Sequence, residues 1–243
     1  VNDDARETAV MREALRMYPL SWSFSPIAPE DELRVEAEDS TRVFIDTIHG
    51  VVSAADSNLL THQGLVDRDR FVAQLRSRVR RYLPLDACLR GEGDALTIDD
   101  STYAGLQAAR LAHEHGHAVT FFLNGYNIAE QKPYHFSRLS AAFDDAKVDH
   151  IIFEGAQYDL RTTAAKQRLR SIIKRRLALL GSDEDCQSFV SEIGVLLGIE
   201  EIVVPPWLLP MTGADVVDLV VAGVEVQNHG WTHVLVGCLL YTS

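Results

Sequence analysis

The chain has 243 residues, of which 47% are hydrophobic and 24% are charged, and its formal net charge at pH 7 is −12. These proportions are typical of folded globular proteins and exclude a disordered chain, a collagen and a small disulfide scaffold. The acidic excess would repel a phosphate backbone, so we expect no nucleic acid partner. No apolar run reaches the roughly 18 residues of a membrane helix, so we expect no membrane span.

Cysteine usage bears on the compartment. The three cysteines, Cys88, Cys186 and Cys238, are far apart and odd in number, which fits reduced thiols better than a disulfide framework. The N-terminus has neither the basic nor the apolar part of a signal peptide, but the chain does not begin with Met. We therefore expect a cytoplasmic protein, unless a leader precedes this sequence.

The first predicted elements differ in character from the rest. Residues 6–17 have helical spacing and precede an acidic segment without a clear period, so we interpret residues 1–41 as an N-terminal arm or a remnant. Residues 42–49 are rich in β-branched and aromatic side chains and stop at Gly50, which predicts a strand. After a polar loop, apolar positions at helical spacing predict an amphipathic helix from Phe71 to Leu83.

The alternation of strand and helix then continues. Residues 95–98 and 118–123 are predicted strands, and between them a helix over 103–115 is closed by Gly116. Near the end, Thr212 and Asp215 form a capping box for a helix that ends at Gly223, and residues 224–227 form a further strand. This order predicts an α/β fold with a parallel sheet or barrel.

A helical insertion is predicted between the third and fourth strands, over residues 124–211. One apolar stripe lies in residues 169–180, and Ser182 with Asp185 caps a second helix that carries apolar residues up to Leu197. The basic residues from Arg161 to Arg176 alternate with the first stripe, which is typical of a solvated helix face. The alternative is a lid over an anionic glycan or a lipid-phosphate carrier.

Two polar clusters follow predicted strands, Asp99-Asp100 and the segment from His229 to His233. Active sites of parallel α/β proteins lie past the carboxyl ends of the strands. One carboxylate and two imidazoles suit Zn²⁺ or a similar divalent ion, and a helical turn over 229–233 would put both imidazoles on one side. A second carboxylate beside the ligand can act as a general base. The alternative is a helix cap and two incidental histidines.

Two other patterns are weighed down. The cluster His113, His115 and His117 lies at the opposite end of its helix, so we expect it to be structural and away from the metal cluster. The adjacent aspartates resemble the nucleophile loop of haloacid-dehalogenase-type phosphatases, but that chemistry needs two aspartates separated by one residue. A phosphatase is therefore disfavoured.

Taken together, the segments 95–100, 118–122 and 224–233 resemble the polysaccharide deacetylases, the NodB-homology carbohydrate esterases. The resemblance covers about residues 42–237 and implies a partial, distorted (β/α) barrel that includes the helical insertion. It also implies that Asp99 is the catalytic base and that Asp100, His229 and His233 hold a divalent metal, most simply Zn²⁺. Two departures from the family pattern are Ser101, where Gly is usual, and Gly230, where Ser or Thr is usual.

The same resemblance implies a function. We expect a metal-dependent hydrolase that removes acetyl groups from N-acetylated or O-acetylated sugars, with an acetylated glycan or glycolipid as substrate; the alternative is a non-catalytic carbohydrate-binding relative. The family's general-acid and oxyanion motifs would lie beyond residue 243, and residues 238–243 look like a non-native tail. We therefore expect a fragment that by itself binds metal weakly and shows little activity.

Overall fold

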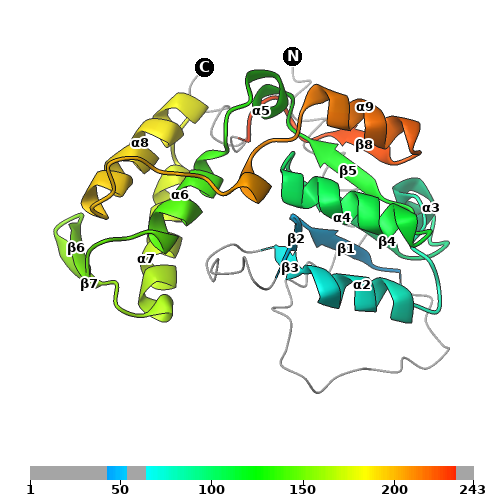
Figure 1. Ribbon diagram of the computed structural model, residues 1–243, viewed down its shortest axis with the longest axis horizontal. Coiled ribbons are helices and arrows are strands. Elements are labelled where there is room, and N and C mark those ends of the chain that lie inside the picture. The colour runs from blue at the N-terminus through cyan, green and yellow to red at the C-terminus, as the bar shows by residue number, and fades with distance from the viewer. Residues whose placement is uncertain (1–42, 54–63, 234–243) are drawn as a thin grey trace, which may run out of the picture. The chain divides into compact units, whose positions relative to one another are not determined.

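The structure is a computed structural model that describes residues 43–53 and 64–233 (Figure 1). Its centre is a four-stranded parallel sheet in the order β1-β4-β5-β8. The strands are β1 (Ile45–Ile48), β4 (Ala95–Asp99), β5 (Thr120–Leu123) and β8 (Glu225–Asn228). The predicted α/β class with a parallel sheet is confirmed. The described residues do not close a barrel, and the N-terminal helix predicted at 6–17 and the tail at 238–243 lie outside them.

Helices pack on this sheet and share a hydrophobic core with it. The helices are α2 (Arg68–Ser77), α3 (Leu85–Leu89), α4 (Tyr103–Glu114) and α9 (Gly213–Val221). The core joins strand residues such as Ile98 and Phe121 to helix residues such as Phe71, Leu106 and Leu219, all of them buried. The capping box predicted at Thr212 and Asp215 is present at the start of α9 and thereby confirmed.

A small second sheet replaces part of the predicted polar loop. Its strands, β2 (Gly50–Val52) and β3 (Leu65–Asp67), pair in parallel. Gly50 has a φ of +148° and lies against helix α4, so that an added Cβ would stand 2.3 Å from the carbonyl carbon of Ala104 and 2.5 Å from the nitrogen of Gly105. The backbone of the first strand-to-strand connection therefore passes α4 at a distance that only glycine permits.

This close approach gives a stability prediction. Gly50→Ala is expected to lower the free energy of unfolding by about 2 kcal/mol or more, because the new methyl group meets backbone atoms that cannot move aside. Gly213→Ala is the matched control, since an added Cβ there meets nothing within 4 Å. At this first position of α9 we expect a change within about 0.5 kcal/mol. Urea denaturation of both variants checks this, and equal stabilities would contradict it.

The helix predicted up to Leu83 is shorter than expected, because α2 ends at Ser77. Arg78 adopts an extended conformation, and its guanidinium pairs with Asp94 next to strand β4. The following Val79 is fully exposed, so its assignment to the apolar stripe was wrong. The backbone N–H of Leu83 then donates to the carbonyl of Asp94 at 2.8 Å. Pairing with the strand region thus competes with the helix, and the chain leaves α2 at Arg78.

The predicted insertion contains helices and also a β-hairpin that the sequence did not indicate. Its elements are α5 (Gly125–Glu130), α6 (His135–Asp144), β6 (His150–Phe153), β7 (Ala156–Asp159), α7 (Thr163–Leu177), α8 (Asp183–Leu196) and the 3₁₀ helix η2 (Pro206–Leu208). Helices α6, α7 and α8 enclose a core of their own, and Ser182 caps α8 as predicted. Figure 1 shows η2 leading from this helical part back to α9.

The basic residues of α7 are not all solvated. Lys174, Arg175 and Arg176 are exposed, as predicted. Arg170, however, is only 6% exposed, and it donates from Nη2 to the Oγ of Ser140 on α6 at 2.8 Å. Burial lowers the pKa of the Arg170 guanidinium to about 10. Arg170 therefore joins α7 to α6, which corrects its assignment to the solvated face.

Two further expectations concern thiols and membranes. Cys88 and Cys186 are buried as thiols, as predicted, whereas Cys238 lies outside the described residues. Within residues 43–53 and 64–233, no helix combines the length and the apolar character that crossing a membrane requires.

Candidate metal centre

The strand ends bring Asp100, His229 and His233 together. Asp100 directly follows β4 and His229 directly follows β8, and both strands pair in parallel with β5. The Oδ1 of Asp100 lies 3.7 Å from Nε2 of His229 and 3.3 Å from Nε2 of His233. One ligand atom from each residue lies within 4.8 Å of the others, so that this group could hold a metal ion. The set of one carboxylate and two imidazoles suits Zn²⁺.

Asp100 itself shows features expected of a ligand. Its side chain is 1% exposed, and its backbone has a φ of 68°, a left-handed conformation that is uncommon for a residue other than glycine. Its Oδ1 is buried and has no hydrogen-bond partner, whereas its Oδ2 accepts a hydrogen bond from Nδ1 of His49 at 2.7 Å. A buried carboxylate oxygen without a donor is costly, and a cation between it and the imidazoles would satisfy it.

The two histidines lie in a loop and not in the predicted helical turn. Gly230 has a φ of +91°, which turns the chain directly after His229 and explains why this position departs from the family pattern. The loop is tied to the sheet because the side-chain amide of Asn124 donates to the carbonyl of His229 at 2.8 Å. Burial lowers the pKa of His233 more than the charge of Asp100 raises it, which favours the neutral imidazole that a metal requires.

Sequence reasoning missed a hydrogen-bonded group that connects the two clusters. Ser101 is buried, and its Oγ accepts from the backbone N–H of Asn124 at 2.8 Å. The hydroxyl of Tyr134 accepts from the backbone N–H of Ser101 at 2.7 Å and donates to Oδ1 of Asn124 at 3.1 Å. Ser101 thus has a structural use in place of the family's glycine. The only signal in the sequence was that Asn124 directly follows a predicted strand.

Asp99 and Asp100 have different environments. Asp99 is partly exposed, and burial together with the charge of Asp100 raises its pKa, although the imidazoles of His229 and His49 oppose this rise. Burial would also raise the pKa of Asp100, but the hydrogen bond from His49 and the nearby imidazole charges outweigh it, so that the pKa is lowered. The more basic carboxylate is therefore the accessible one, an arrangement typical of a base beside an ionised partner.

The N-terminal end of α6 forms one wall of the cluster. Centroids of the Tyr134 and Phe136 rings lie 6.1 and 5.0 Å from the centroid of the His233 ring, both in edge contacts. His135 lies 6.4 Å from His233, and its Nδ1 is 3.3 Å from a carboxylate oxygen of Asp183 on α8. The insertion therefore contacts the candidate metal centre directly, as a lid over the rim of the sheet would.

The second histidine cluster is structural, as predicted. His117 is buried, where its Nδ1 accepts from the backbone N–H of Tyr82 at 3.1 Å and its Nε2 donates to the carbonyl of Leu75 at 3.1 Å. The Nδ1 of His115 donates to the carbonyl of Leu111 at 2.8 Å. Neither imidazole belongs to the metal-like group found in the described part of the chain.

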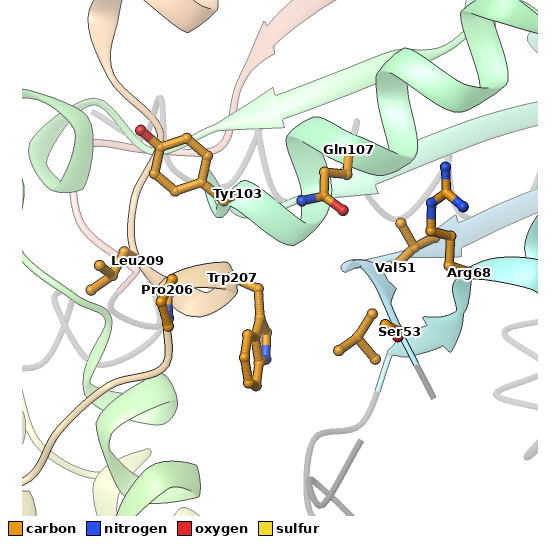
Figure 2. A pocket seen from close by; sticks show the side chains of 9 residues that line it. Val51, Ser53, Arg68, Tyr103, Gln107, Pro206, Trp207 and Leu209 are labelled. Atoms are coloured by element: carbon orange, nitrogen blue, oxygen red, sulfur yellow. The ribbon is translucent and has the colours of Figure 1, made fainter. Parts of the chain in front are cut away.

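A cavity of about 410 Å³ lies near the start of α4 (Figure 2). Apolar side chains form most of its wall, with Arg68 and Gln107 as polar members and the Trp207 ring on the η2 side. The other lining residues are Val51, Val52, Ser53, Tyr103, Pro206 and Leu209. Tyr103 follows Asp100 by three residues, so that one turn of chain separates this cavity from the cluster, although no member of the cluster lines it.

Comparisons with known proteins leave the argument to the site itself. A scan against protein-family models found no match to this chain. Searches of curated proteins and of solved structures also found no significant similarity. The resemblance to polysaccharide deacetylases therefore rests on the motifs of this sequence, and the functional conclusion rests on those motifs and on the geometry of the candidate metal centre.

Proposed function

We propose that this protein is a metal-dependent hydrolase of the polysaccharide deacetylase type, which removes acetyl groups from N-acetylated or O-acetylated sugars. The observation that carries this proposal is the buried Oδ1 of Asp100, which has no hydrogen-bond partner and faces the Nε2 atoms of His229 and His233. A second carboxylate, Asp99, directly precedes it. A ligand set with an adjacent base is what hydrolysis by an activated water needs.

The residues divide the work according to their environments. Asp100, His229 and His233 would hold the ion, and a bound divalent ion supplies Lewis-acid polarisation of the acetyl carbonyl and a lowered pKa for the attacking water. Asp99 accepts the proton of that water, a role that its raised pKa favours because a stronger base takes the proton more readily. Asp100 stays ionised, because its lowered pKa keeps the proton off the ligand.

The test measures metal content and acetate release on the same preparation. It uses the full-length gene product, because the resemblance places the family's general acid and oxyanion donor beyond residue 243. We expect about one equivalent of zinc per chain, loss of acetate release from N-acetylglucosamine oligomers or O-acetylated xylan after chelation, and recovery when Zn²⁺ is added back. Binding of these glycans without acetate release would favour the non-catalytic alternative, and absence of metal binding would overturn the proposal.

A further inference from the structure

His49 is the one residue outside the predicted cluster that contacts a predicted ligand through a printed hydrogen bond of 2.7 Å, from its Nδ1 to Oδ2 of Asp100. It directly follows β1, the neighbour of β4, and the two strands are in register from Ile45 and Ala95 to Ile48 and Ile98. The parallel register therefore brings His49 beside the end of β4, fifty-one positions away in sequence.

The fold fixes where the His49 imidazole lies. The backbone N–H of His49 donates to the carbonyl of Gly64 at 2.9 Å. An added Cβ on Gly64 would stand 2.0 Å from Cδ2 of His49, so the ring occupies the space that a side chain at position 64 would need. Below it, the hydroxyl groups of Thr47 and Thr97 lie 2.8 Å apart and join β1 to β4. The ring is thus held from the backbone side, and its Nδ1 is aimed at Asp100.

The carboxylate of Asp100 needs such a partner. The left-handed backbone at Asp100 is a conformation that costs a residue other than glycine about 1–2 kcal/mol, so regular strand geometry does not set the direction of this side chain. The hydrogen bond from His49 occupies Oδ2 and leaves Oδ1 facing the imidazoles of His229 and His233. Hydrogen bonds to the outer oxygen of a metal ligand orient that ligand and raise the affinity for the metal.

We propose that His49 is a positioning residue for the metal centre, which donates from Nδ1 to Oδ2 of Asp100 and thereby presents Oδ1 to the ion. This inference rests on the proposed metal site. It assigns to His49 neither a contact with substrate nor a bond to the ion, because Nδ1 is directed at the carboxylate. It also gives a reason for the residue at the end of β1, a strand that carries no part of the family resemblance in the sequence.

The test compares three variants by Co²⁺ titration of the full-length gene product, followed by visible absorption. His49→Ala removes the donor and is expected to raise the Kd for Co²⁺ about 10–100-fold. His49→Asn can place an amide N–H close to the position of Nδ1, so we expect it to restore a Kd near that of the wild type with the same absorption spectrum. His113→Ala, which removes an exposed histidine away from the site, is expected to leave the Kd unchanged.

Each outcome separates this inference from the proposed function. If the wild type binds Co²⁺ and His49→Ala binds it equally well, the positioning role is wrong while the metal site stands. If His49→Asn is as weak as His49→Ala and its spectrum differs from that of the wild type, the imidazole is itself a ligand and the assignment is overturned. If the wild type binds no Co²⁺, both proposals fail. Melting temperatures of the metal-free variants identify any that do not fold, and Gly64→Ala then provides a second way to displace the ring.

Discussion

Asp99→Asn is expected to lower the rate of acetate release by about 10²–10⁴-fold, the usual contribution of a general base, and to leave zinc bound. The expectation follows from the difference between the two aspartates. Asp99 is partly exposed and has a raised pKa, whereas the buried Asp100 faces the two imidazoles. An amide at position 99 cannot accept the proton of the attacking water, but it removes no atom from the ligand group.

Asp100→Asn is the matched comparison, because it makes the same chemical change one residue further on. We expect it to abolish stable zinc binding, since a neutral amide is a much poorer ligand than a carboxylate. Zinc content by mass spectrometry and acetate release are measured on both variants of the full-length gene product. Loss of zinc from Asp99→Asn with retention in Asp100→Asn would show that the base and the ligand have been interchanged.

Ile173→Asp is expected to lower the free energy of unfolding by about 3 kcal/mol or more, because it places an uncompensated charge in an apolar core. Ile173 lies on α7 and is 0% exposed. It belongs to the core that α7 shares with α6 and α8, which includes Leu169, Val190 and Ile193. Chemical denaturation monitored by circular dichroism gives the change in stability.

Val195→Asp provides the control for that change. Val195 lies on α8 in the same insertion, but its side chain is 72% exposed, so the new carboxylate remains in water. We expect its effect on stability to stay within about 0.5 kcal/mol. An Ile173→Asp protein as stable as the Val195→Asp protein would mean that the α7 stripe is not buried, and the insertion would then lack the core described above.

Local patterns in the sequence were enough for most helices and strands of the sheet. The capping side chains of Ser182 and Thr212 bind their predicted partners, because a cap involves residues only three positions apart. The hairpin of β6 and β7 was missed because its turn is formed by Glu154 and Gly155, both with positive φ, and Glu-Gly lacks the Asn or Asp that usually marks such a turn. The end of α2 was missed because pairing of Arg78 with a distant aspartate decides it.

The sequence by itself determined which chemical groups follow the strands: two adjacent carboxylates after one, and two imidazoles separated by three residues after another. Only the tertiary structure decided which of these groups meet and what holds them. The order β1-β4-β5-β8 places His49 beside Asp100, and it places Asn124 where it binds both Ser101 and the carbonyl of His229. Pairing between parallel strands joins residues that are far apart in sequence, so no local period records it.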